Sequence, residues 1–225
     1  MIIQFSNCID FFNKMILTEL TPVCKCWIAG GCVRDYFSIG RISSDIDFYF
    51  PTDEEFEKCK QYLLHQDFVE VEEAQDDGSV QKVKKEKPLA TFLFENENVI
   101  KLKYKGRKVD IIKKLFSSPQ ETIDAFDFTV CCAAVDGVKI YHHETFFIDL
   151  AKRQLMINQL PFPLSTLSRL QRYVQKGYYM CNGEMLKLSQ AIGALLTNTE
   201  EGLNAAIEED ILSADSNSRR FKTFD

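Results

Sequence analysis

Two glycines and two aspartates, close together in the chain, have the types and spacing to do chemistry. Gly30 and Gly31 are followed at short distance by Arg34, and then by Asp45 and Asp47, which are separated by one residue. Alternate side chains of an extended segment face the same side, so both carboxylates would share a face. Two like charges this close oppose each other's ionisation unless they share a cation. Because Mg²⁺ prefers oxygen ligands, the pair predicts half of a site for Mg²⁺ or Mn²⁺.

The double glycine predicts a backbone cradle for phosphate. Gly30 and Gly31 alone are a weak signal, since double glycines are common in turns. Here they follow a short apolar strand and open a helical turn, where the backbone can approach a phosphate closely. Arg34 on that turn could bind a phosphate oxygen while Asp35 orients it. The alternative for Arg34 and Asp35 is a surface salt bridge.

A third carboxylate, Asp110, lies inside the apolar run from Val109 to Ile112. Aspartate is unfavourable in strands, so a functional reason for its presence is indicated. The alternative for Asp110 is an exposed place on the outer face, and for Asp45 and Asp47 it is solvation at a turn or edge strand. Metal-assisted nucleotidyl transfer needs two or three convergent carboxylates around ions about 4 Å apart. The three aspartates therefore predict a catalytic metal site.

Composition sets the class of protein. The chain has 225 residues, of which 45% are hydrophobic and 27% charged, so we expect a globular domain or a domain with an appendage. It contains no run of 18 apolar residues and no charged region like that of a signal peptide at its start, which predicts a cytoplasmic protein without a membrane partner. A net charge of −6 argues against a general nucleic-acid coat protein but leaves room for a local basic groove.

The eight cysteines favour free thiols in a reducing compartment. Cys24, Cys26 and Cys32, with the pair His142-His143, could suggest zinc. The chain has no C-x-x-C pair, however, so core or surface thiols are the better interpretation.

The elements that must position these residues follow from local patterns. Apolar residues at helical spacing predict a helix over 5–19, and Thr52-x-x-Glu55 is a capping box that opens a helix with Phe56, Cys59 and Leu63 on its inner face. The charged segment 70–88 is interpreted as a mobile loop or irregular hairpin, usually a solvated surface and less often a gating flap. Strands are expected at 26–29, 45–50, 91–94, 99–104, 108–112, 128–135 and 138–141, with a helical turn at 33–37 and a short helix from Ser118.

Strand signals stop beyond Asp149, where helices are expected at about 164–177, 183–197 and 200–212. We therefore predict an α+β head domain at residues 1–150 and a small all-helical, neck-like domain with a polar tail at 151–225. The head should hold a mixed, mostly antiparallel sheet flanked by helices.

The order of these motifs resembles the head and neck of the nucleotidyltransferase superfamily (DNA polymerase β-like), especially the bacterial-type tRNA CCA-adding enzymes and poly(A) polymerases. Gly-Gly-x-Val-Arg-Asp, a glycine and Asp-x-Asp follow one another as in that family, and Tyr104 to Ile112 is similar to its hairpin ending in the third acid. Asp127-Phe128-Thr129, Asp149-Leu150 and the helix Thr166 to Tyr178 resemble its later elements. The resemblance implies nucleotide binding by Gly30, Gly31, Arg34, Asp127, Arg169 and Arg172, and metal binding and catalysis by Asp45, Asp47 and Asp110.

The chain also departs from that family. Ala125 and Phe126 stand where the family has Arg-Arg, and Thr166 stands where it has the aspartate that reads the incoming base. A neutral hydroxyl cannot replace a carboxylate acceptor toward a base amino group, so selection of C and then A is not expected. The helix still places Arg169, Arg172 and Lys176 on one face, either as a solvated basic stripe or as the wall of a nucleotide or RNA groove.

These features together predict a Mg²⁺-dependent nucleotidyltransferase that uses an NTP and an acceptor hydroxyl, with an RNA 3′ end (a tRNA or tRNA-like fragment) as the leading acceptor by resemblance. In this role Asp110 would complete the metal site and help to deprotonate the attacking hydroxyl. Two alternatives stay open. One is nucleotide transfer onto a protein side chain or small molecule, and the other is a nucleotide- or RNA-binding module without catalysis.

Overall fold

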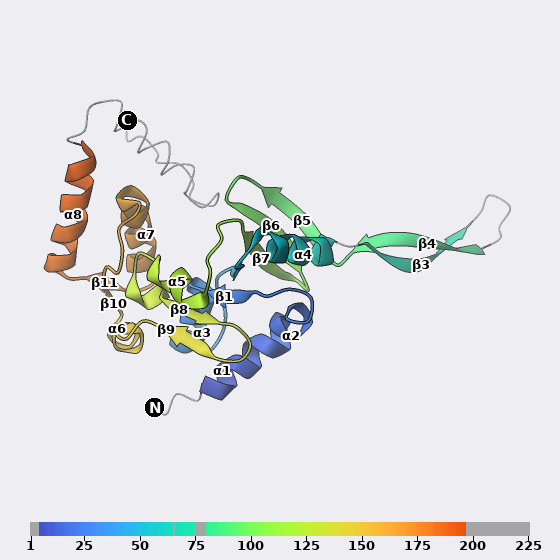
Figure 1. Cartoon of the computed structure of the whole chain (residues 1–225), viewed down its shortest axis with the longest axis horizontal. Helices are drawn as coiled ribbons and strands as arrows, with labels where there is room; N and C mark the ends of the chain where they lie inside the picture. The colour runs from blue at the N-terminus through green and yellow to red at the C-terminus, as the bar shows by residue number, and fades with distance from the viewer. Residues whose placement is uncertain (1–4, 65, 75–79, 197–225) are drawn as a thin grey trace. The chain divides into compact units, whose positions relative to one another are not determined.

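A central seven-stranded sheet organises the computed structural model, which describes residues 5–64, 66–74 and 80–196 (Figure 1). The strand order is β5-β6-β7-β2-β1-β8-β9, and the pairing of β2 with β7 is parallel while the other pairs are antiparallel. The predicted α+β class with a mixed, mostly antiparallel sheet is therefore confirmed. The strands are β1 (Trp27–Ala29), β2 (Ile46–Tyr49), β5 (Ala90–Glu95), β6 (Val99–Tyr104), β7 (Arg107–Ile112), β8 (Ala133–Val135) and β9 (Ile140–His142).

The helices of the N-terminal half begin and end close to the predicted places. The expected N-terminal helix is formed by α1 (Phe5–Phe12), a π-helical segment (Asn13–Leu17) and α2 (Thr18–Leu20). α3 (Gly31–Ile39) follows β1, α4 (Asp53–Leu64) follows β2, and α5 (Pro119–Asp124) follows β7. Half of the predicted capping box is present, because the Glu55 N–H donates to Thr52 Oγ1 at 3.3 Å. The predicted inner face of α4 is also confirmed, since Phe56, Cys59 and Leu63 are buried.

The two-residue turn between β6 and β7 fixes the pairing on which the site depends. Lys105 and Gly106 both have positive φ, 47° and 79°, as tight hairpin turns require. Tyr104 therefore pairs with Arg107, and counting back along both strands pairs Lys101 with Asp110.

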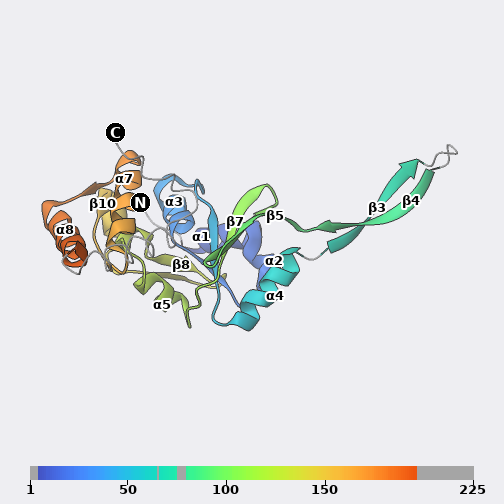
Figure 2. The same ribbon diagram turned by 90° about the horizontal axis from the view of Figure 1, so that it is seen from above.

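The segment expected to be a loop or irregular hairpin is a regular antiparallel hairpin. β3 (Gln66–Ala74) and β4 (Val80–Pro88) form a two-stranded sheet of their own, which Figures 1 and 2 show. Pairing runs without a shift from Gln66 opposite Pro88 to Ala74 opposite Val80. The loop interpretation was wrong, because a charged composition does not prevent strands from pairing when their register is continuous.

The strand expected over 128–135 is correct only in its second half. Thr129–Cys131 is a 3₁₀ helix, closed by the Cys131 N–H to Phe128 O (2.9 Å) and the Cys132 N–H to Thr129 O (3.0 Å). The Thr129 hydroxyl also donates to Asp149 Oδ2 at 2.7 Å, which holds this turn in place of a strand. β8 begins only at Ala133.

The chain divides into two compact units, residues 1–123 with 133–142 and residues 124–132 with 143–225. The boundary predicted near residue 150 stays a prediction. The second unit contains α6 (Phe146–Lys152), α7 (Pro163–Gln175) and α8 (Asn182–Leu196). It is not all-helical, because two short strands, β10 (Gln154–Leu155) and β11 (Tyr179–Met180), pair in parallel. The helix expected at 200–212 lies outside the described residues, and within them no helix is long and apolar enough to cross a membrane.

Candidate functional site

Two of the three predicted carboxylates lie on adjacent interior strands of the first unit, and the third, Asp45, directly precedes β2. Asp47 on β2 lies directly opposite Asp110 on β7, and residues opposite each other on adjacent strands face the same side. Asp45 precedes Asp47 by two residues and so shares its face. Because Asp110 is only 5% exposed, the alternative of an exposed Asp110 was wrong. The edge strand was also wrong for Asp45 and Asp47, since β2 is an interior strand, but a solvated turn at Asp45 stays an alternative, because this residue lies just before β2 with its side chain 28% exposed.

Lys101 is a site residue that the sequence interpretation missed. Its ammonium lies 2.5 Å from Asp110 Oδ2 and 4.0 Å from Asp45 Oδ2, and the residue is 8% exposed. A signal for it existed, since the Lys105-Gly106 turn pairs Lys101 with Asp110 by simple counting. Lys101 therefore lies in the same cluster as the three aspartates. We call Asp45, Asp47, Asp110 and Lys101 together the carboxylate group.

The row of paired residues continues across the sheet with small side chains. Asp47 lies opposite Ala29 on β1, and Ala29 lies opposite Ala134 on β8; both alanines are fully buried. α3 contacts β1, β2 and β8, and brings Cys32 near Asp47. Burial raises the pKa of the Cys32 thiol and the negative charge of Asp47 raises it further, so this thiol stays protonated.

The donor chemistry of the carboxylate group fits a hard divalent cation. Within residues 5–64 and 66–196, apart from the undescribed 75–79, no three His, Cys, Asp or Glu side chains are arranged as a metal site. The Lys101 ammonium already contacts two of the three aspartates, Asp45 and Asp110. Three carboxylates and one ammonium leave two formal negative charges, which one divalent ion held by Asp45 and Asp47 would neutralise.

The double glycine forms a tight connection from β1 into α3. Gly30 has φ 84° and ψ −130°, a conformation that side chains disfavour, and its N–H donates to Ala133 O at 2.9 Å. That amide belongs to the sheet, so a phosphate would instead meet the first amides of α3, which have no partner inside the helix. A Cβ on Gly31 would lie 3.2 Å from Ser44 Oγ, so glycine here keeps the helix start close to the segment before Asp45.

Arg34 is buried beside this turn and is held by its neighbour. Its guanidinium donates to Asp35 Oδ1 from Nε (2.9 Å) and Nη2 (2.5 Å), while Asp35 Oδ2 accepts the Ser43 hydroxyl at 2.5 Å. The two residues do form an ion pair, but the alternative of a pair on the surface was wrong, since Arg34 is 3% and Asp35 5% exposed. Nη2 lies 3.6 Å from where a Cβ on Gly31 would be, so the guanidinium faces the glycine turn.

Ser44 is a second residue that the sequence interpretation missed. Its hydroxyl oxygen is buried and has no hydrogen-bond partner among the described residues. It lies between the Gly31 turn and Asp45, and a buried hydroxyl without a partner is costly unless a ligand supplies one. We count Ser44 among the candidate phosphate-binding groups, although no pattern in the sequence distinguished it from its neighbours.

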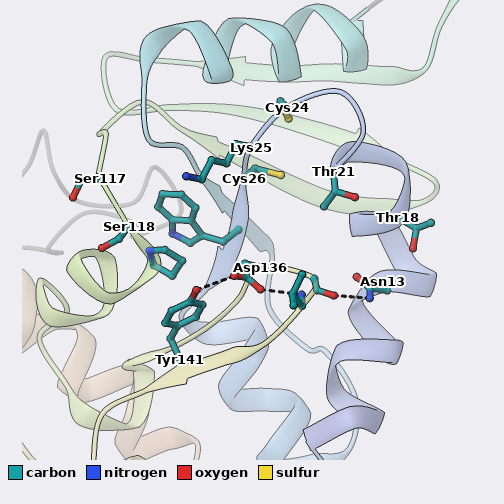
Figure 3. Close-up of a pocket in the computed structure, with 14 residues that line it drawn as sticks. Asn13, Thr18, Thr21, Cys24, Lys25, Cys26, Ser117, Ser118, Asp136 and Tyr141 are labelled. Carbon is teal, nitrogen blue, oxygen red and sulfur yellow. Dashed lines mark hydrogen bonds between the residues drawn. The ribbon is translucent and has the colours of Figure 1, made fainter.

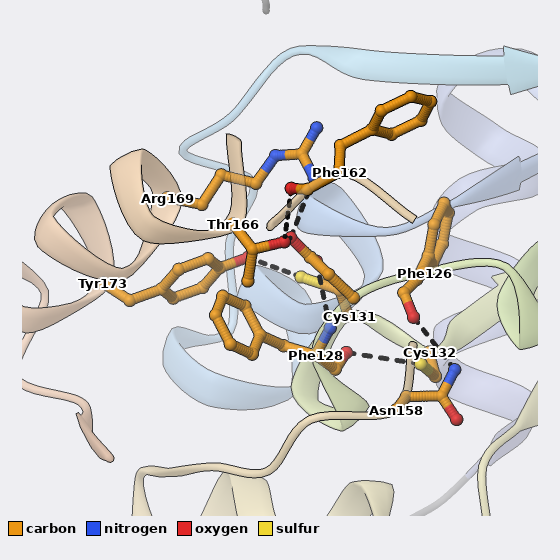
Figure 4. A network of polar contacts seen from close by, with 10 residues as sticks. Phe126, Phe128, Cys131, Cys132, Asn158, Phe162, Thr166, Arg169 and Tyr173 are labelled. Carbon is orange, nitrogen blue, oxygen red and sulfur yellow. Dashed lines mark hydrogen bonds and ion pairs between the residues drawn. The ribbon is translucent and has the colours of Figure 1, made fainter. Parts of the chain in front are cut away.

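Asp127 in the second unit accepts hydrogen bonds from Thr166 and Arg169. Figure 4 shows these two donors within the polar network. Asp127 Oδ2 accepts from Arg169 Nη1 at 2.8 Å and from Thr166 Oγ1 at 3.3 Å, while Oδ1 accepts the Phe128 N–H at 2.9 Å. Burial opposes the charge of Arg169, but the charge of Asp127 and its hydrogen bond outweigh burial and raise the Arg169 pKa. Asp127 thus has a balanced set of partners.

Thr166 does not face an open base-reading place. It is fully buried, and its single hydroxyl hydrogen is shared between Asp127 Oδ2 and Phe162 O, which lies 3.1 Å from Oγ1. Arg169 keeps 34% of its side chain exposed and Arg172 is exposed, so these two cations remain candidates for nucleotide binding. Tyr178 is buried and packs against Tyr173, with ring centroids 5.6 Å apart. The nucleotide-binding roles of Asp127, Arg169 and Arg172 stay predictions.

A pocket of about 600 Å³ lies elsewhere in the first unit, at the start of β1 (Figure 3). Its wall includes Lys25, Trp27, Ser118, Asp136 and Tyr141. None of the predicted site residues lines it, and the glycine turn follows the opposite end of β1. Asp136 is occupied in the hairpin turn, where it accepts from the Val138 and Lys139 amides and from the Tyr141 hydroxyl. This pocket is separate from the carboxylates.

Comparison with known proteins gives both a family and a fold. The family described as "Gad2: Gabija anti-defense 2 family protein" matches residues 3–153. The chain belongs to this family. It is also 30% identical over 191 residues to "Gabija anti-defense 2" of Bacillus phage SPbetaL7, and the match covers 78% of this chain. The chain spans only 39% of that relative's length.

Solved structures with similar folds include CCA-adding enzymes, as the sequence resemblance predicted. The Thermotoga maritima CCA-adding enzyme complexed with tRNA_CCA has a TM-score of 0.56 at 19% identity, over 95% of this chain and 51% of that one. A CCA-adding enzyme complexed with CTP has a TM-score of 0.57 at 19% identity, over 95% and 52% of the two chains. The nucleotidyltransferase-like fold is therefore confirmed.

Proposed function

We propose that this chain is a divalent-metal-dependent nucleotidyltransferase, which transfers a nucleoside monophosphate from an NTP to an acceptor hydroxyl and releases pyrophosphate. The observation that carries the proposal is the pairing of Asp47 with Asp110, with Asp45 on the same face. The Gly30-Gly31 turn at the end of the next strand supports it. The relative's name also leads us to propose that this chemistry counteracts Gabija defence.

Each group has a role in that reaction. Asp45 and Asp47 would hold Mg²⁺ or Mn²⁺, which when bound polarises the phosphate and the attacking oxygen. The amides at the start of α3, Arg34 and Ser44 would bind the triphosphate. The acceptor oxygen bonds to the α-phosphorus while the bond from that phosphorus to the pyrophosphate oxygen breaks. The acceptor's proton passes to the Asp110 carboxylate.

An RNA 3′ end, on a tRNA or tRNA-like molecule, is the first acceptor we propose. The fold likeness to CCA-adding enzymes supports it. The test is incubation of the purified chain with Mg²⁺, total cellular RNA and each NTP in turn, labelled on its α-phosphate, followed by resolution of the labelled species. We expect label on RNA that RNase releases; an absence of labelled RNA with all four NTPs would reject this acceptor.

A protein side chain is a second acceptor, and the family favours it. A protein named for acting against a defence system could do so by modifying one of that system's proteins. The same incubation with a lysate from Gabija-bearing cells distinguishes the two acceptors. Label that resists RNase and is removed by protease would support the protein acceptor, and label removed by RNase alone would reject it.

A further inference from the structure

The charges of the carboxylate group are arranged around one fixed cation. Lys101 comes from β6, the neighbour of β7, and its ammonium contacts Asp110 Oδ2 at 2.5 Å. The same nitrogen lies 4.0 Å from Asp45 Oδ2. One ammonium thus contacts carboxylates from two segments of the chain, as an ion that bridges Asp45 and Asp110 would also have to do.

A second divalent ion would compete with this ammonium. Mg²⁺ binds carboxylate oxygens at about 2.0–2.1 Å, so an ion bound to Asp110 Oδ2 would lie very close to Lys101 Nζ. Two metal ions in a nucleotidyl-transfer site are about 3.5–4 Å apart, and they serve to hold the attacking and leaving oxygens. Like charges this close in a buried site repel strongly unless one of them leaves.

The burial of Lys101 argues that it does not leave easily. The residue is 8% exposed, and a buried ammonium is retained only where charged partners compensate for its lost hydration. Lys103, two residues along the same strand, is exposed and has no such position. The burial of Lys101 therefore goes with its contacts to Asp45 and Asp110, and is not a general property of lysines on β6.

We propose that Lys101 takes the place of one of the two metal ions. The chain then binds a single divalent cation at Asp45 and Asp47, while the Lys101 ammonium neutralises Asp110 and supplies a fixed positive charge beside the reacting phosphate. Three carboxylates are balanced by one ammonium and one divalent ion. This inference rests on the proposed function, since it defines the metal requirement of the same site.

The test counts bound Mn²⁺ in the full chain, without nucleotide or acceptor, by equilibrium dialysis and by the electron paramagnetic resonance signal of free Mn²⁺. We expect one ion per wild-type chain, two in Lys101→Met, and one again in Lys101→Met with Asp110→Asn. Lys101→Arg, which keeps the charge, and the exposed control Lys103→Met should each bind one.

Two bound ions in the wild type, or one in a folded Lys101→Met, would overturn the inference. If Lys101→Met does not fold, the wild-type count still decides it. Failure of the proposed function is a separate result. Two bound ions in a chain that transfers nucleotide reject the inference alone, and one bound ion in a chain that transfers none rejects the proposed function alone.

Discussion

Asp110 in the first unit and Asp127 in the second are similar in burial and differ in charge balance. They are 5% and 7% exposed, and each holds one cation, Lys101 or Arg169. Asp110 lies opposite a second carboxylate, Asp47, whereas the remaining partners of Asp127 are a hydroxyl and an amide. A buried aspartate with a cation is therefore no sign of catalysis by itself. The second carboxylate opposite Asp110 is what favours a bound cation there.

The largest expected effect concerns the aspartates near Asp110. Asp45→Asn with Asp47→Asn keeps the shape of both side chains and removes two charges, so we expect nucleotidyl transfer to fall by about 1,000-fold or more. Thermal unfolding should change little, because like charges are removed. The control is Asp10→Asn on α1, where the aspartate is exposed. If the double variant retained transfer, Asp45 and Asp47 would be structural, and the contrast between the sites of Asp110 and Asp127 would be rejected.

Thr166→Asp tests the network of Asp127, Thr166 and Arg169. It places a carboxylate where a fully buried hydroxyl donates to Asp127, so two like charges would meet with one arginine. We expect a loss of about 3 kcal/mol in the free energy of unfolding, measured in urea. Thr166→Ser, which keeps the donor, should lose about 1 kcal/mol. A stable Thr166→Asp with a changed NTP preference would instead show that Thr166 occupies a base-reading place.

A double-mutant cycle sharpens the contrast at Arg169. Asp127→Asn and Arg169→Gln should each destabilise the chain, with a coupling energy of about 2 kcal/mol, because they share a 2.8 Å ion pair. The measurement is urea unfolding of the two single variants and the double variant. If the coupling is near zero while Arg169→Gln raises the KM for NTP, Arg169 binds nucleotide and is not chiefly a partner of Asp127.

The smallest effects concern the glycine turn. Gly30→Ala should destabilise the chain by about 1–2 kcal/mol, since φ is 84° there. Gly193→Ala is the matched control, because that glycine lies within α8 with open space around it, and alanine there should add up to about 1 kcal/mol. Thermal unfolding compares them. Equal effects at the two positions would mean that the turn is not strained.

The sequence predicted correctly those helices, strands and turns that depend on interactions between residues close together in the chain. The capping residue Thr52, the Lys105-Gly106 turn and the alternation around Asp47 each act over a few residues, and the structure has these elements where they were expected. The 3₁₀ turn at Thr129 could not be predicted this way, because it depends on Asp149, twenty residues away in the sequence. For the β3–β4 segment a hairpin was one of two alternatives, and its regular pairing was not expected because charge was taken as a sign of irregular structure.

In the candidate site too, local sequence patterns identified some residues, while others could be found only from the tertiary structure. Its carboxylates could be named from the sequence, since aspartates in strand-forming runs are unusual. Lys101 required the hairpin register as well as its residue type, and Ser44 required knowledge of the space beside Gly31. The burial of Thr166 depends on tertiary packing around Asp127, which no spacing along α7 reveals.

The central claim is that the Asp45, Asp47 and Asp110 group transfers a nucleotide. It is tested most directly by parallel reactions of the purified wild-type chain with each NTP in turn, labelled on the α-phosphate or on the γ-phosphate, in heat-inactivated lysate that contains both RNA and protein. The account predicts that α-label joins the acceptor while γ-label leaves as pyrophosphate, and that Asp45→Asn with Asp47→Asn abolishes both. Transfer of the γ-label to the acceptor, or α-label transfer that survives in the double variant, would contradict it.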